Sequence, residues 1–389
     1  MPIKKYMRRA CKLLLSILGA VAAAALCLCA VVFLSSQADK RKFAGRQQAH
    51  IAALEAAYSR PDYIPADEKT LTGFDVDAAV REGLRLNEIR FIATHNSYKA
   101  YNPMAEWIMD RLVASLGLGD RGIWSYGFEP LSQQLDSGIR SFELDVMREK
   151  GGFRCAHAPV VDYASNCPDF GLALKEIALW SEHHPGHLPV TVLVEAKASA
   201  LSGGMLYHKF NMDDVLALDK LVADALGARL CAPAELLGAH ETFARLRSGD
   251  GYPPLSALLG KVIVIYHYDW RGTTRAYVAQ DPTVRSLSMF PSAAQWMRYE
   301  DIDPNQDYAC FLLDNWSGSE YIEVFSGEHN MLVRVRSDAY PWRMGEWPWE
   351  ADARETGAFI ISTDFPPRGD SEGDTHPVTF EGGATVARR

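Results

Sequence analysis

The sequence predicts an α/β fold, a distorted (β/α)8 barrel, preceded by one apolar transmembrane helix. Between residues 74 and 367, short apolar runs alternate with longer amphipathic ones, eight of the runs have the length of strands, and chemically versatile side chains follow several of them. In a closed parallel barrel the carboxyl ends of the strands meet at one rim. We therefore expect one domain with its functional site at that rim.

The N-terminus combines a basic segment with a long apolar one. Residues 1–12 contain five Lys and Arg, and residues 13–34 contain no charged residue, which is long enough for a helix to cross a bilayer. We expect a single-pass membrane anchor. The alternative is a secreted domain released from a signal peptide near Ser36-Gln37-Ala38, although the apolar core of a signal peptide usually has only ~7–15 residues.

Orientation of the anchor is not fixed by charge, because basic residues lie on both sides of the span. The chemistry inferred below favours an extracytoplasmic domain. Residues 35–73 are expected to form a juxtamembrane helix or stalk, since apolar residues recur at helical spacing until Pro61 stops the helix. The barrel is expected to occupy residues 74–367. Residues 368–389 lack an apolar period and are expected to be a disordered tail.

The strands and helices expected inside the barrel follow from the spacing of apolar residues, which differs between strands and amphipathic helices. The candidate strands are residues 89–93, 141–147, 153–157, 190–195, 262–266, 309–313, 332–336 and 359–362. The candidate helices are residues 104–116, 132–137, 170–183, 213–226 and 320–325. Residues 198–252 are long for one crossover, so we expect an insertion on the barrel rim there.

Composition excludes some classes of function. The chain has a formal net charge of −9, and without residues 1–34 it holds 35 Lys and Arg against 49 Asp and Glu, a net charge of −14. Such an acidic body is poorly suited to gripping nucleic acid phosphates. No Cys-x-x-Cys spacing suggests a zinc ribbon. Cys155 and Cys167 could form a bridge in an oxidising compartment or could be two unrelated apolar side chains.

Two carboxylates on one strand indicate a metal site. Glu143 and Asp145 are two residues apart, so both point to the same face, which in a barrel is the interior. They would repel each other unless a cation lies between them. The alternative is a pair of salt bridges to Arg or Lys. Asn96 and Glu195, at other strand ends, complete an all-oxygen set that suits Ca²⁺ better than Mg²⁺ and disfavours zinc.

His95 and His157 are the histidines that we place in the site. Imidazoles titrate near neutral pH, so one can accept a proton from an attacking hydroxyl while the other protonates a departing alkoxide. Lys197 and Arg334, with Arg336, share strand faces with the carboxylates and could bind a substrate phosphate or ring hydroxyl, or could equally pair with the carboxylates.

Two other groups of polar residues are given structural interpretations. His183, His184 and His187 surround Pro185-Gly186, which indicates a solvated helix-to-strand turn rather than a metal cluster. Asp364 follows the last candidate strand and is interpreted as a turn residue or helix cap.

These residues resemble the calcium-dependent, phosphoinositide-specific phospholipase C-like phosphodiesterases. The matching stretches are Thr94-His95-Asn96-Ser97-Tyr98, LSQQLDSGIRSFELD at residues 131–145, Ala156-His157, LVEAK at residues 193–197 and ISTDFP at residues 361–366. The resemblance implies a distorted TIM barrel with His95 and His157 as catalytic residues. It implies that Asn96, Glu143, Asp145 and Glu195 bind calcium.

The reaction that the resemblance implies is attack by an inositol 2-hydroxyl on the adjacent phosphorus, which releases diacylglycerol and a cyclic inositol phosphate. The expected partners are thus a phospholipid substrate and the membrane. A glycerophosphodiester phosphodiesterase or a sphingomyelinase D-like lyase would use a similar barrel. A barrel that binds an anionic phospholipid without turnover is the non-enzymatic alternative.

Overall fold

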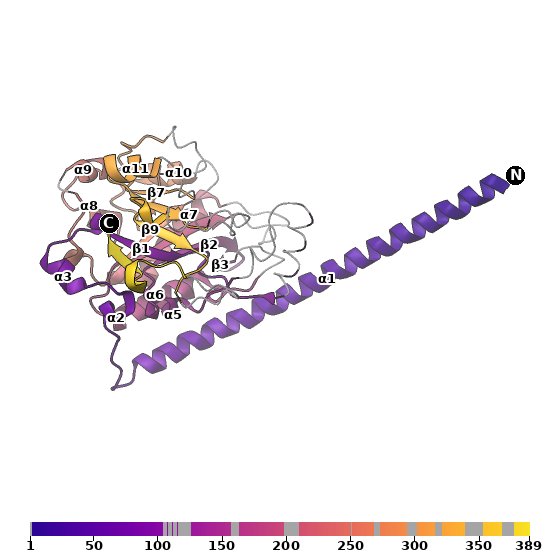
Figure 1. The fold of residues 1–389 in the computed structure, drawn as a ribbon, viewed down its shortest axis with the longest axis horizontal. Coiled ribbons are helices and arrows are strands. Elements are labelled where there is room, and N and C mark those ends of the chain that lie inside the picture. Colours follow the sequence, from indigo (N-terminus) through magenta and orange to yellow (C-terminus); the bar gives the residue numbers. More distant parts are fainter. Residues whose placement is uncertain are drawn as a thin grey trace.

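The computed structural model describes residues 2–103, 126–156, 163–197, 210–249, 251–267, 273–293, 302–315, 321–338, 353–367 and 377–389, together with the single positions 107, 111 and 115. A parallel barrel lies at the centre of this structure (Figure 1). Its strands are β1 (Ile89–Thr94), β2 (Ser141–Glu149), β4 (Val190–Lys197), β5 (Val262–His267), β6 (Phe290–Pro291), β7 (Phe311–Leu313), β8 (Leu332–Arg336) and β9 (Ile360–Thr363).

The eight parallel strands follow one another around the barrel in chain order. Hydrogen bonds join β6, β5, β4, β2, β1, β9, β8 and β7 in that sequence. A parallel bridge between Ser292 and Phe311 connects β6 to β7 and brings the two ends of the sheet together. The predicted (β/α)8 barrel is therefore confirmed.

One predicted barrel strand is not part of the barrel. Residues 153–157 were expected to be the third barrel strand, but β3 (Gly152–Cys155) pairs antiparallel with β2 as the second arm of a hairpin. The place that this leaves in the barrel is filled by β6, which has only two residues. A strand of that length shows no period in the sequence, so only its pairing with β5 identifies it.

The C-terminal residues add a further antiparallel strand. β10 (Val386–Arg388) pairs with the first half of β1, on the side of β1 that faces β2. Consequently β1 and β2 pair directly only at Thr94 and Phe142, and the barrel is distorted at this seam. The expectation of a disordered tail is wrong for residues 377–389, and residues 368–376 lie outside the described part. Thr385 anchors the strand by hydrogen bonds to Thr72 and Gly138, contacts that no local pattern reveals.

Helices cover the outside of the barrel. They are α2 (Glu68–Thr72), α3 (Val76–Arg81), α5 (Leu131–Asp136), α6 (Phe170–His183), α7 (Met212–Leu226), α8 (Pro233–Leu237), α9 (Phe243–Ser248), α10 (Thr273–Gln280) and α11 (Tyr321–Glu323). α6 has the predicted bounds because Asp169 caps it and its apolar face is buried against the sheet. Of the predicted helix 104–116 the structure describes positions 107, 111 and 115, and all three are helical. The first part of the predicted insertion, residues 198–209, lies outside the described residues.

The N-terminal helix α1 (Pro2–Tyr58) is continuous and much longer than the barrel is deep (Figure 1). Its apolar part is long and hydropathic enough to cross a membrane, with a mean hydropathy of 2.8 over a window of which none is buried. By length and composition a signal sequence would pass the same test. The later part of α1 packs on the barrel, and the helix ends at Tyr58, before Pro61.

Candidate active site

The carboxyl ends of the parallel strands bring most of the predicted site residues to one rim. His95 and Asn96 follow β1, Glu143 and Asp145 lie on β2, and Glu195 lies on β4. Asp145 and Glu195 are partners in the register of β2 and β4. Site residues that are up to about a hundred positions apart in the sequence therefore lie close together in space.

The three carboxylates form a compact cluster. Glu143, Asp145 and Glu195 each offer an oxygen within 4.8 Å of the others. Asp145 is fully buried and its Oδ1 has no hydrogen-bond donor among the described residues. Burial, opposed by Lys197 and reinforced by the charges of Glu195 and Glu143, raises the pKa of Asp145 to about 7. A divalent cation with oxygen ligands would relieve this crowding, so the donor set fits calcium.

Asn96 joins the cluster through a shared tyrosine. The Tyr98 hydroxyl lies 3.1 Å from Asn96 Oδ1 and 2.6 Å from Asp145 Oδ2, and the Asn96 amide donates to the Tyr126 hydroxyl at 2.8 Å. The backbone of Asn96 is left-handed, with φ of 52°, a conformation that asparagine tolerates better than most residues. Asn96 Oδ1 and Asp145 Oδ2 therefore both face the Tyr98 hydroxyl.

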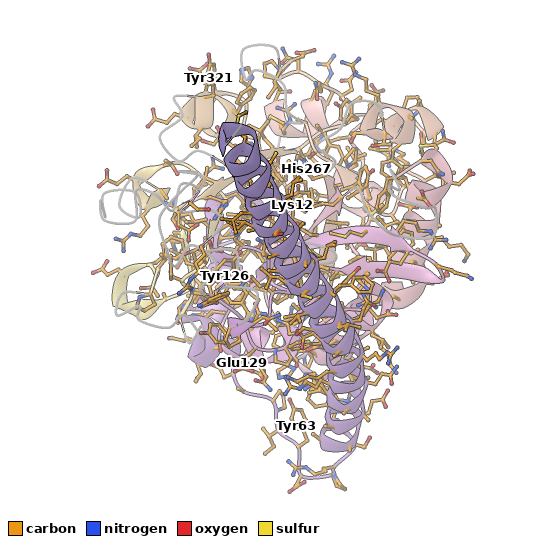
Figure 2. All side chains as sticks on the ribbon, turned by 90° about the vertical axis from the view of Figure 1, so that its right-hand side faces the viewer. Lys12, Tyr63, Tyr126, Glu129, His267 and Tyr321 are labelled. Carbon is orange, nitrogen blue, oxygen red and sulfur yellow. The ribbon has the colours of Figure 1, made fainter. Side chains whose placement is uncertain are left out.

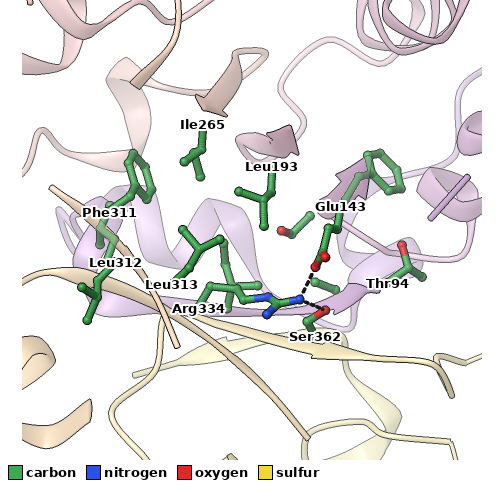
Figure 3. Close-up of a pocket in the computed structure, with 14 residues that line it drawn as sticks. Thr94, Glu143, Leu193, Ile265, Phe311, Leu312, Leu313, Arg334 and Ser362 are labelled. Carbon is green, nitrogen blue, oxygen red and sulfur yellow. Dashed lines mark hydrogen bonds and ion pairs between the residues drawn. The ribbon is translucent and has the colours of Figure 1, made fainter. Parts of the chain in front are cut away.

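Two basic side chains pair with the carboxylates. Lys197 Nζ lies 2.6 Å from Asp145 Oδ2 and 3.5 Å from Glu195 Oε1. Arg334 pairs with Glu143 and also donates to Ser362 Oγ at 3.2 Å, as Figure 3 shows. The sequence left open whether Lys197 and Arg334 pair with the carboxylates or bind substrate, and this structure contains the ion pairs. The role of these residues in binding substrate stays a prediction.

His95 is held by Asp364, which the sequence predicted to be a turn residue or helix cap. His95 Nδ1 lies 2.7 Å from Asp364 Oδ1, and Nε2 lies 3.8 Å from Glu143 Oε1. Burial, followed by the charge of Arg336, lowers the pKa of His95 to about 3, so the ring is neutral at physiological pH. With Nδ1–H donating to Asp364, Nε2 carries the lone pair and can accept a proton.

Asp364 is therefore not merely a turn residue or helix cap. Its second oxygen lies 3.2 Å from Arg336 Nη2, which also pairs with Asp338. Its backbone N–H donates to Asp338 Oδ2 at 2.6 Å. A carboxylate two residues after the predicted strand 359–362 was a signal for this role, because strand ends share the rim.

Sequence reasoning also missed His267 and Tyr126. His267 ends β5, is the register partner of Glu195, and lies with Nδ1 3.2 Å from Ser292 Oγ. Burial tends to raise the pKa of Glu195, but Lys197 and then His267 outweigh it, so that this pKa is lowered. Tyr126 could not be identified from the sequence, because it lies in a segment without a recognisable apolar period.

Two further predictions concern the loop after β3. His157 lies outside the described residues, so its role stays a prediction. Cys155 and Cys167 are free, buried thiols in hydrogen-bond contact with each other. They are thus neighbours, as a bridge would require, and no bridge joins them in this structure.

The barrel interior beneath the carboxylates is filled. Leu193, Ile265, Phe311 and Leu313 face one another there and leave a cavity of about 10 Å³, room for roughly one water (Figure 3). A substrate must therefore bind above the carboxylates, at the rim. Figure 2 looks at this end of the molecule, with Tyr126 and His267 labelled on either side of the projecting α1.

Comparison with known proteins agrees with this geometry. The family described as phosphoinositide phospholipase C, Ca²⁺-dependent, matches residues 84–152 and 148–389, most of the chain. No curated protein matches the chain.

Two solved structures share the fold. A calcium-dependent phosphoinositol-specific phospholipase C from the Gram-negative bacterium Pseudomonas sp has 18% sequence identity and a TM-score of 0.53, with 78% of this chain and 95% of that chain covered. A Ca²⁺-dependent phosphatidylinositol-specific phospholipase C from Streptomyces antibioticus has 20% identity and a TM-score of 0.54, with 78% and 99% covered. At these identities the likeness establishes the fold.

Proposed function

Since the chain belongs to the family of Ca²⁺-dependent phosphoinositide phospholipases C, we propose that it cleaves a phosphatidylinositol-type phosphodiester. The observation that carries the proposal is the meeting of the Glu143, Asp145 and Glu195 carboxylates with the His95–Asp364 pair at one rim. Barrels that only bind an anionic lipid need neither a neutral, oriented imidazole nor three crowded carboxylates.

Calcium is the metal of this family, and four side chains of this chain would hold it. Asn96, Glu143, Asp145 and Glu195 supply the oxygen ligands. Bound calcium would offset negative charge on the phosphoryl oxygens and lower the pKa of a nearby hydroxyl. Lys197 and Arg334 would then exchange their carboxylate partners for the substrate phosphate or a ring hydroxyl.

The proton transfers are assigned to histidines. The inositol 2-hydroxyl oxygen forms a bond to phosphorus while its proton passes to His95 Nε2, and Asp364 stabilises the resulting imidazolium. The bond from phosphorus to the glycerol oxygen breaks, and His157 supplies the proton that this oxygen needs. The products are diacylglycerol and a cyclic inositol phosphate, which water can open by the reverse transfers.

The N-terminal helix supports a membrane location. We propose that residues 13–34 anchor the chain and that the barrel is extracytoplasmic; secretion after cleavage near Ala38 is the alternative. Carbonate extraction of membranes from expressing cells separates the two, because an anchored chain stays with the lipid and a cleaved one is released.

The function is tested by headgroup release. The full chain in mixed vesicles should release inositol phosphate from phosphatidylinositol when calcium is present and lose this activity when calcium is chelated. Glycerophosphocholine and sphingomyelin, assayed in parallel, represent the glycerophosphodiesterase and the sphingomyelinase D-like alternatives. Turnover of either in place of phosphatidylinositol would contradict the proposal, and so would lipid binding without any headgroup release.

A further inference from the structure

One face of α1 is built to pack on the catalytic domain. From residue 36 onward its buried side chains are spaced by four or seven residues, which places them on a single stripe of the helix. These side chains are Ser36, Phe43, Gln47, Ile51 and Tyr58. The stripe starts just after the apolar span, whose last two residues, Phe33 and Leu34, are 44% and 66% exposed. The same helix is therefore membrane-like in its first part and docked in its second.

The docked part of α1 runs beside α6 and in the same direction. Three contacts progress together along both helices, and they are Gln47 with Asp169, His50 with Glu176 and Tyr58 with His183. The first of these is reciprocal, since the Gln47 amide both donates to the Asp169 carbonyl and accepts from its N–H at 2.9 Å. Because α6 leads from the rim back to the start of β4, α1 also runs from the rim toward the opposite end.

The N-terminal end of the docked part reaches the rim itself. Lys40 Nζ lies 2.8 Å from Glu149 Oε2, at the carboxyl end of β2. Asn102, in the loop after β1, donates to Asp39 Oδ2 at 3.2 Å. Residues before these therefore project beyond the rim, as Figure 1 shows for the part of α1 that extends past β2 and β3.

We propose that α1 is a rigid strut which holds the barrel rim against the bilayer that its own residues 13–34 span. The geometry leaves little slack, because the helix is continuous from Leu34 to Lys40, and the six steps between these residues rise only about 9 Å. The apolar span rises about 33 Å, which matches the hydrocarbon core of a bilayer. The rim thus faces the surface of the membrane that anchors the chain.

The side chains at the expected lipid surface suit an anionic leaflet. Arg41, Lys42 and Arg46 are exposed on the part of α1 next to the span, and basic residues at this level attract anionic headgroups. The partner of this surface is therefore a leaflet of acidic phospholipids. In combination with the proposed function, on which this consequence rests, the enzyme would draw its substrate from the membrane that holds it.

The orientation can be measured without any catalysis. In a full-length background with Cys11, Cys27 and Cys29 changed to Ala, a fluorophore is attached at Lys150→Cys, in the hairpin at the rim, or at Glu182→Cys, at the end of α6 away from the rim. Both native residues are exposed. After reconstitution into vesicles with a headgroup-labelled quencher lipid, the probe at residue 150 should be quenched several-fold more strongly than the probe at residue 182.

A matched variant tests the strut itself. Insertion of a flexible Gly/Ser linker of about 20 residues between Leu34 and Ser35 keeps the span and the docked helix but breaks their continuity. The difference between the two probes should then disappear. Equal quenching in the uninterrupted chain, persistence of the difference after the insertion, or release of the chain by carbonate would each overturn the proposal. Because no readout depends on turnover, an inactive but correctly oriented chain would refute only the proposed function.

Discussion

Buried ionisable side chains gather at both ends of the barrel, but their partners differ. At the rim, Asp145 Oδ1 has no donor among the described residues, and three carboxylates lie together, paired with Lys197 and Arg334. At the opposite end, His187 Nε2 lies 2.7 Å from Ser181 Oγ and Nδ1 lies 2.6 Å from the Leu188 carbonyl.

Other buried polar side chains at this opposite end of the barrel also have hydrogen-bond partners. Arg140 donates to both oxygens of Glu68 and to two backbone carbonyls, and its guanidinium lies 4.9 Å from the centre of the Trp180 ring. The His184 ring stacks on the Trp180 ring, with the two ring centres 4.1 Å apart. The expectation of a solvated turn is wrong for His184 and His187, which are buried, although Pro185 and Gly186 between them are exposed.

The difference separates structure from function. A buried polar network whose members all have partners stabilises the fold, whereas one with crowded like charges and an unpartnered oxygen is prepared for a ligand. Substitutions at the rim should therefore change turnover and calcium binding, and substitutions at the other end should change stability.

The largest expected effect is that of His95→Ala on turnover. Loss of the proton acceptor should reduce phosphatidylinositol cleavage by about 10²–10⁴-fold, with a melting temperature close to that of the parent chain. His240→Ala, outside the rim network, is the control and should keep full activity. Equal turnover of the two variants would show that the rim histidine has no chemical role.

The second effect concerns stability and pH at the opposite end. Burial lowers the pKa of His187 to about 4, below the value of about 6.5 in an unfolded chain. Stability that is present above pH 6.5 should therefore be lost as the pH falls toward 4, because the unfolded state binds the proton more readily; the loss is up to about 3 kcal/mol. Urea unfolding in detergent at several pH values measures it.

His187→Gln supplies the comparison for this pH effect. The variant should be less stable than the parent at pH 7, and the gap should narrow as the pH falls toward 4. A gap that stays constant over this range would mean that His187 is not the group responsible. Turnover per folded molecule should remain that of the parent, in contrast to His95→Ala.

The third effect is stabilisation by calcium. At a calcium concentration a hundred times its Kd, the folded state should gain about 2.7 kcal/mol, seen as a higher melting temperature. Asp145→Asn removes a ligand charge and should abolish most of this gain. Asp224→Asn, on the surface of α7 and paired only with Lys220 among the described residues, should leave it intact; a loss in both variants would refute the site.

The smallest effect tests the lysine that lies among the carboxylates. Lys197→Met removes a cation that calcium must displace, so calcium should bind roughly tenfold more tightly, equivalent to about 1.4 kcal/mol. Isothermal titration measures this change. Lys220→Met, which breaks a surface ion pair, serves as the control. Weaker calcium binding to Lys197→Met would show that the lysine supports the site instead of competing for it.

Local patterns were sufficient for much of the barrel. β1, β2, β4, β5, β8 and α6 are long, continuous apolar or amphipathic runs, so their periodicity predicts both their type and their place. The carboxylate cluster was also predictable, because residues two apart on a strand share a face and the ends of parallel strands share a rim. The role of Asp364 was missed because a single carboxylate after a strand has many ordinary explanations.

The sequence by itself determined the alternation of elements, the apolar span and the set of oxygen and imidazole groups that gather at the rim, since each depends on the order of neighbouring residues. Tertiary structure alone decided that β6 closes the barrel, that β10 inserts beside β1, that Asp364 orients His95 and that α1 docks along α6. Each of these depends on contacts between residues far apart in the chain, whose energies appear only when the backbone has brought them together.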